Sequence, residues 1–104
     1  MTAEQLQLND YELGYLTCFS HAMLEQFKSD DPFDGGEDDV WYGLTLDERV
    51  FDLNIWRDLD GSTSCSVFEC VKNPSDEYET DTSKAHHLWK SNHYYPHILS
   101  GERL

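Results

Sequence analysis

The spacing of apolar residues changes near residue 40, and this change constrains the fold more than any other feature of the chain. Between residues 10 and 28, apolar side chains recur at helical spacing, whereas from Val40 they occupy every second position. A helix and a strand present different periodicities, so one amphipathic helix must precede a run of strands. This order predicts an α+β domain in which the helix covers one face of a sheet.

The predicted helix over residues 10–28 carries signals at both ends. Asn9 can cap the first turn, Glu12 three residues later completes a capping box, and Lys28 lies in the last turn. The stripe at helical spacing consists of Leu13, Leu16, Ser20, Met23, Leu24 and Phe27. Gly14 costs about 1 kcal/mol relative to alanine, which indicates either close packing at Gly14 or a helix that begins later.

Three strands joined by short turns follow the helix. Apolar residues alternate over Val40–Leu46 and Phe51–Trp56, and a third strand spans Thr63–Lys72. Asp58–Gly61 supplies a hairpin turn, because glycine reaches the backbone conformations that tight turns require. Since antiparallel neighbours need only short connections, this order predicts a three-stranded antiparallel meander (α-β-β-β).

The chain after the third strand predicts a short C-terminal element of α or β type. Residues 78–82 can extend as an edge strand. Residues 84–91 can form a short helix that is capped by Thr82 or Ser83 and docks its apolar residues on the core. Residues 92–104 are predicted to be irregular.

Acidic residues outnumber basic ones by 21 to 7, which gives a formal net charge of −14 over 104 residues. Nucleic acid and anionic lipid bind through Lys and Arg, so this excess predicts no direct nucleic-acid ligand and no membrane. Solubility asks of a small domain a net charge of only about 2 to 8 in magnitude. The surplus therefore predicts a basic protein partner, with a solubility device and salt adaptation as alternatives.

The composition also predicts one folded cytoplasmic domain over residues 1–104. Hydrophobic residues make up 38% of the chain and aromatic residues 13%, which is enough material for a core. The first residues lack the basic and apolar regions of a signal peptide, and no apolar stretch approaches the ~20 residues that span a bilayer. The odd count of three cysteines predicts reduced thiols rather than a disulfide framework.

The acidic residues gather in two runs, which we predict to contact the partner. The first run lies in a loop predicted over residues 29–39 and consists of Asp30, Asp31, Asp34, Glu37, Asp38 and Asp39. The second consists of Asp76, Glu77, Glu79 and Asp81. If this second run is extended, alternate carboxylates project from one face about 6.7 Å apart, close to twice the ~3.4 Å charge spacing of one DNA strand. Because ordered charges lose less entropy on binding, reversing Glu77, Glu79 and Asp81 is expected to be more damaging per residue than reversing the loop.

Metal, cofactor and catalytic sites are not predicted. Cys65 and Cys70 are five residues apart, so on one regular strand their side chains point to opposite faces. The segment from His93 to His97 contains Pro96, which disfavours the helix that would align both imidazoles on one metal ion. Acidic pairs are too numerous to single out a catalytic one, and the sequence has neither a phosphate-binding loop nor a nucleophile motif. We therefore expect no cofactor and no enzymatic activity.

In length, α+β character and charge, and in the runs DDPFDGGEDD and SDEYETD, the chain resembles the small acidic counter-defence proteins of phages and mobile elements. These are the anti-CRISPR proteins and the DNA-mimic anti-restriction proteins. The resemblance implies a stoichiometric inhibitor that occupies the basic nucleic-acid-binding surface of a CRISPR or restriction complex subunit. We expect the protein to be a metal-free monomer or weak dimer. An immunity or antitoxin protein that neutralises a basic nuclease uses the same electrostatics and is the alternative.

Overall fold

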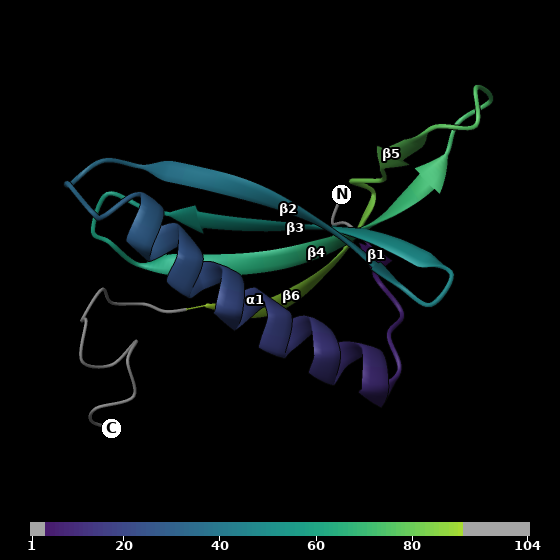
Figure 1. The fold of residues 1–104 in the computed structure, drawn as a ribbon, viewed down its shortest axis with the longest axis horizontal. Coiled ribbons are helices and arrows are strands. Elements are labelled where there is room, and N and C mark those ends of the chain that lie inside the picture. The colour runs from purple at the N-terminus through teal and green to yellow at the C-terminus, as the bar shows by residue number, and fades with distance from the viewer. Residues whose placement is uncertain (1–3, 91–104) are drawn as a thin grey trace.

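The computed structural model describes residues 4–90, in which one long helix lies across a curved sheet (Figure 1). The elements in chain order are β1 (Glu4–Gln5), α1 (Asp10–Asp30), β2 (Asp38–Leu46), β3 (Arg49–Arg57), β4 (Thr63–Lys72), β5 (Tyr78–Thr80) and β6 (Lys84–Lys90). The predicted α+β class is confirmed. No helix within residues 4–90 has the length and apolar composition that crossing a bilayer requires.

The sheet is larger than the predicted three-stranded meander. Its strand order is β1-β6-β4-β3-β2, so β2, β3 and β4 are antiparallel neighbours and β6 pairs antiparallel with the other edge of β4. β1 then adds to β6 in parallel, while β5 pairs with the far end of β4. A meander followed by one short element therefore describes only part of the sheet.

The helical alternative for residues 84–91 is wrong, because residues 84–90 form strand β6 and residue 91 lies outside the described residues. The cap signal at Ser83 belongs to a turn: its backbone N–H and its hydroxyl both donate to Asp81 Oδ1, at 3.0 and 2.6 Å. Short polar side chains satisfy turns and helix ends by the same kind of bond, so the local signal is ambiguous. The turn sends the chain back along β4, where Leu88 and Trp89 pack against the core as their element was predicted to do.

The predicted start of α1 is confirmed in detail. Asn9 Oδ1 accepts from the backbone N–H of Glu12 at 2.8 Å, and the Glu12 carboxylate accepts from the backbone N–H of Asn9 at 3.0 Å. The helix continues two residues beyond the predicted end, to Asp30. Neither expectation for Gly14 holds, because the helix begins at Asp10 and no atom lies within 4 Å of a Cβ added at Gly14.

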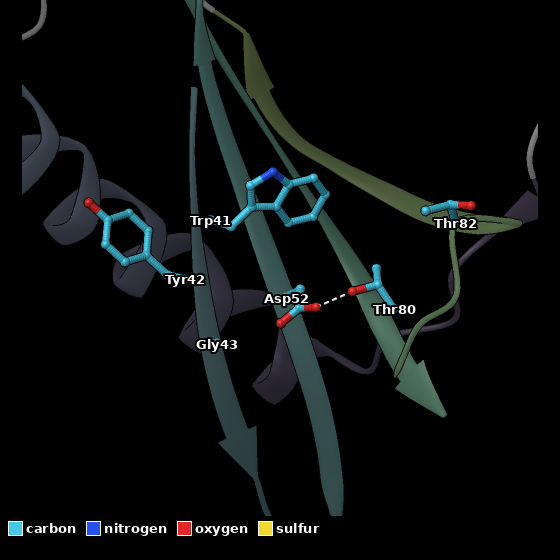
Figure 2. A pocket seen from close by; sticks show the side chains of 6 residues that line it. All are labelled: Trp41, Tyr42, Gly43, Asp52, Thr80 and Thr82. Carbon is cyan, nitrogen blue, oxygen red and sulfur yellow. Dashed lines mark hydrogen bonds between the residues drawn. The ribbon is translucent and has the colours of Figure 1, made fainter. Parts of the chain in front are cut away.

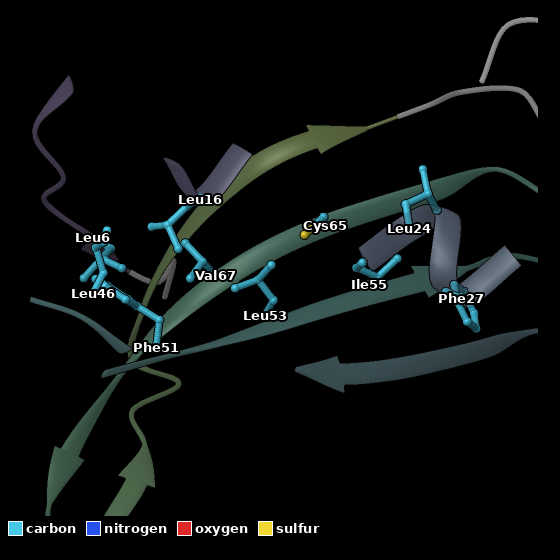
Figure 3. Close-up of a cluster of buried hydrophobic side chains, with 10 residues drawn as sticks. All are labelled: Leu6, Leu16, Leu24, Phe27, Leu46, Phe51, Leu53, Ile55, Cys65 and Val67. Carbon is cyan, nitrogen blue, oxygen red and sulfur yellow. The ribbon is translucent and has the colours of Figure 1, made fainter. Parts of the chain in front are cut away.

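The core fills the space between α1 and the sheet (Figure 3). The helix contributes apolar side chains at turn spacing, and β3 and β4 contribute alternate residues from the face that α1 covers. The buried apolar residues are Leu6, Leu16, Leu24, Phe27, Leu46, Phe51, Leu53, Ile55, Cys65 and Val67. The opposite face of β2, β3 and β4, which we call the open face, carries the intervening residues.

Arg49 ties the start of the helix to the sheet. Its guanidinium donates to Glu12 at 2.8 Å, to both carboxylate oxygens of Glu69 at 2.9 and 2.8 Å, and to the carbonyl of Gln7 at 3.1 Å. The N–H of Asn9 and then Arg49 hold the pKa of Glu12 below its usual range. These carboxylates therefore serve the fold, since charged hydrogen bonds of this kind stabilise more than neutral ones.

Candidate functional site

An acid-lined hollow of about 430 Å³ lies where β2 begins and β3 ends. We call it the acidic hollow, and its walls are formed by Glu37, Asp38, Asp39, Asn54, Trp56, Arg57 and Asp58. Four of these seven residues carry carboxylates. The hollow thus brings four carboxylates together with the Trp56 ring and the buried Arg57 at one end of the β2–β3 pair.

Antiparallel pairing brings these side chains together. Asp39 lies opposite Trp56 in the ladder, and Asn54 donates to Asp39 Oδ2 at 3.3 Å and to the carbonyl of Val40 at 3.1 Å. Asp58 follows β3 directly, and its backbone N–H donates to the carbonyl of Ser62 at 2.9 Å in the turn. The strand register, rather than the loop sequence, therefore builds the acidic hollow.

A buried arginine holds the connection from α1 to β2 in place beside the hollow. Arg57 is 2% exposed, and its guanidinium lies over the rings of Phe27 and Phe33, at 4.9 and 5.3 Å from their centroids. Its Nη1 donates to the carbonyl of Asp31 at 2.9 Å. Because Asp31 and Phe33 are both held, the segment that leads into Glu37 is anchored at its start.

Only part of the first acidic run reaches the hollow. The loop predicted over residues 29–39 is shorter than expected, because Asp30 closes α1, and Asp38 and Asp39 open β2. Asp30 accepts from Gln26 Nε2 at 2.9 Å, and Asp34 accepts from the backbone N–H of Gly36 at 3.1 Å. Asp31 caps the helix, and its Oδ2 lies 3.6 Å from Arg57 Nη2. Of the six predicted residues, Glu37, Asp38 and Asp39 line the acidic hollow.

The second acidic run lies at the hairpin of β4 and β5, where most of its carboxylates have partners within the chain. Asp76 lies 3.3 Å from Lys72 Nζ, and Glu79 accepts from Asn73 Nδ2 at 3.0 Å. Ser83 holds the pKa of Asp81 below its usual range by hydrogen bonding from its hydroxyl and from its backbone N–H. We call Asp76, Glu77, Glu79 and Asp81 the hairpin acids.

The two runs do not form one surface. Backbone bonds from Asn73 to Glu77 and from Asp81 to Glu69 extend the β4–β5 ladder by one step at each end, so Glu77, Glu79 and Asp81 occupy alternate positions as predicted. By register they share the face of Glu69, which belongs to the helix side of β4. Asp39 lies on the open face.

Asp58 and Trp56 belong to the acidic hollow but were not among the predicted site residues. Asp58 follows the alternating series of Asn54 and Trp56, which was visible in the sequence. Asp39 faces the same way on the neighbouring strand. Pairing the two strands through the two-residue turn would have placed them side by side, so the signal was the register and not a local motif.

The two buried thiols, Cys65 and Cys70, are not poised for chemistry. All three cysteines are free, with Cys18 exposed, and burial raises the pKa of Cys65 to about 12. Burial and the neighbouring Asp52 raise the pKa of Cys70 to about 11. A protonated thiol is a poor nucleophile and a poor metal ligand at neutral pH.

Residues 4–90 also contain no group of three His, Cys, Asp or Glu side chains arranged to hold a metal ion. His93 and His97 lie outside the described residues.

No protein-family model, curated protein or solved structure matches the chain. The function is therefore argued from the site's own geometry and charge.

Proposed function

We propose that the protein binds the basic nucleic-acid-binding surface of another protein and inhibits it stoichiometrically, in the manner of anti-CRISPR and DNA-mimic anti-restriction proteins. The observation that carries this proposal is the acidic hollow, whose lining combines Glu37, Asp38, Asp39 and Asp58 with Trp56. A guanidinium or ammonium group that normally contacts phosphate would find carboxylates there instead. Its aliphatic stem or planar face would lie against the indole ring.

The charge of the whole chain supports the same proposal. A formal net charge of −14 attracts a basic surface from beyond contact distance and accelerates association. The exposed acids outside the hollow contribute to this steering without needing a defined contact. The hollow then supplies the short-range contacts that fix one orientation.

The test compares matched charge reversals for capture of a partner. The protein is immobilised and exposed to a nuclease-treated extract of the cells that carry it, alongside Asp38→Lys/Asp39→Lys and the control Glu25→Lys/Glu48→Lys. Both pairs are exposed and remove the same charge. We expect a basic protein that wild type and control retain, that the hollow variant loses, and that added duplex DNA or RNA displaces.

Ionic strength provides the second measurement. Affinity for the captured protein should fall steeply as salt rises, because the contact is largely electrostatic. Binding that is indifferent to salt and that persists on a fully nucleic-acid-occupied partner would exclude mimicry as the mechanism.

A further inference from the structure

Strand β2 forms one edge of the sheet along its full length (Figure 1). It has nine residues and pairs with β3, and within residues 4–90 no strand pairs with its other edge. It contains neither proline nor lysine, the residues that commonly protect such an edge. Its backbone is therefore available to another extended chain.

The turn between β2 and β3 determines which backbone groups point outward. Leu46 pairs with Arg49 across a two-residue connection, so this pair is hydrogen-bonded and alternate residues of β2 face away from β3. The outward N–H and C=O groups belong to Asp39, Trp41, Gly43 and Thr45, and of these the Asp39 N–H already donates to Asp38 Oδ1 at 2.8 Å. The side chains of these same residues lie on the open face, beside the acidic hollow.

A second hollow, mostly apolar, lies on the open face farther along β2, between this strand and residues 80–82 (Figure 2). We call it the apolar hollow, and it is lined by Trp41, Tyr42, Gly43, Asp52, Thr80 and Thr82. Trp41 is 49% exposed and lies on the opposite side of β2 from the Tyr42 ring. The Thr80 hydroxyl donates to Asp52, which closes the floor of the hollow with a satisfied polar pair.

We propose that an extended basic segment of the partner adds to the free edge of β2 as a further strand. The inference deepens the proposed function and rests on it. Backbone bonds to Trp41, Gly43 and Thr45 supply part of the affinity, and side chains of the segment supply the specificity. A Lys or Arg side chain enters the acidic hollow, and an apolar side chain lies on Trp41.

Charge decides between a basic segment and a second copy of the chain. Two copies paired antiparallel about Tyr42 would place Glu37 of each opposite Asp47 of the other, and parallel pairing would set Asp38 and Asp39 beside their equivalents. Like charges directly opposite each other destabilise a strand pair. A basic strand replaces this repulsion with attraction at the same positions.

The test uses a synthetic peptide of about nine residues with lysines at one end and alternating valine and threonine at the other. It is made in both sequence directions, and a control peptide carries methyl groups on alternate backbone nitrogens. The full chain is compared with Gly43→Pro, which removes an outward N–H, and with its matched control Gly43→Ala. A Cβ added at Gly43 would meet Asp52 Oδ1 at 3.7 Å, an ordinary van der Waals distance, so Ala fits. Thr45→Pro and Thr45→Ala form a second pair, and circular dichroism checks that every variant folds.

We expect one peptide direction to bind and to slow hydrogen exchange at the amides of residues 41, 43 and 45. Each proline variant should weaken binding at least about tenfold relative to its alanine control, and methylation of the peptide should do the same. Equal binding by proline and alanine variants would overturn strand addition. If Asp38→Lys/Asp39→Lys still weakens peptide binding in that case, the proposed function survives without strand addition. If the double charge reversal also leaves peptide binding unchanged, the proposed function and strand addition both fail. A wild-type dimer that Gly43→Pro dissociates would overturn the inference in favour of a second copy.

Discussion

The acidic hollow and the hairpin acids contain the same residue types at similar density, yet the chain treats them differently. In the hollow, Asp38 and Asp39 are exposed, Asp39 lies opposite Trp56, and their side-chain bonds are to one backbone N–H and one amide. At the hairpin, Asp76 pairs with a lysine and Asp81 holds the turn into β6. Carboxylates that already bond to groups of their own chain are less available to a partner. The number of acids in a sequence run therefore does not tell how many of them can contact a partner.

A third group of carboxylates sharpens the contrast. Glu12 and Glu69 share the guanidinium of Arg49, and Glu12 also closes the capping box of α1. Here negative charge holds the helix to the sheet. The chain therefore uses acids for folding, for turns and for surface charge, and the partners of each group decide which.

Charge reversal at the two regions should give the largest difference. Asp38→Lys/Asp39→Lys should weaken binding of the captured partner about 100-fold, because like charges would meet where attraction is proposed. Glu77→Lys/Glu79→Lys should weaken it less than about tenfold, through lost steering alone. Affinities measured by calorimetry at fixed salt would check both.

This ranking reverses the one predicted from sequence, which placed the greater effect per residue at Glu77, Glu79 and Asp81. Glu25→Lys/Glu48→Lys again serves as the matched control. A greater loss from the hairpin pair than from the hollow pair would restore the earlier ranking and place the contact on the helix side of β4.

Neutralising a folding carboxylate should have the next largest effect, and it should appear in stability. Glu12→Gln should lower the free energy of unfolding at neutral pH by about 1.5 kcal/mol, since it removes a charged hydrogen bond to Arg49. Asp38→Asn/Asp39→Asn should cause no such loss, because it relieves repulsion among exposed acids. Denaturant unfolding measures both.

The pH dependence supplies an independent check on Glu12. Its pKa is lower in the folded protein than the ordinary 4.5, so its contribution is complete above that value and disappears as pH falls through the lowered folded pKa. Wild type and Glu12→Gln should therefore converge in stability at acid pH. A stability difference that stays constant from neutral to acid pH would show that Glu12 acts by packing rather than by charge.

Replacing the aromatic wall of the hollow should have a smaller effect on binding. Trp56→Leu keeps apolar bulk but removes the π face, so affinity for the captured partner should fall by about tenfold. Trp56→Phe keeps an aromatic ring, so its affinity for the captured partner should fall by less than that of Trp56→Leu. Equal affinity for all three proteins would mean that the ring does not contact a cation.

The helix and the first strands were predictable because their signals are local. Asn9 and Glu12 lie within one turn of each other, and the alternation from Val40 follows from burial of one sheet face. Strand β6 was not predictable in the same way. Ser83 can form the side-chain bonds of a turn as well as those of a helix N-terminus. Pairing with the unoccupied edge of β4 then favours a strand over a helix.

The candidate site was half predictable for a related reason. Composition located Glu37, Asp38 and Asp39 but could not place Asp58 and Trp56 next to them, because these residues meet only across the β2–β3 ladder. The sequence likewise did not show which residues lie next to the hairpin acids. Their partners Asn73 and Ser83 could be identified only once the conformation of the turns was known. Long-range register sets what a local run of charge can do.

The smallest predicted effect calibrates the others at a position outside both acidic regions. Gly14 lies on the exposed side of α1, and nothing within 4 Å would meet an added Cβ. Gly14→Ala should therefore raise the free energy of unfolding by about 1 kcal/mol, through helix propensity and a less flexible unfolded chain. Thermal unfolding should show a midpoint higher by roughly 4 °C or more, with partner affinity unchanged. A lower midpoint would mean that the helix needs flexibility at Gly14, and a changed affinity would extend the partner contact to the face opposite the hollow.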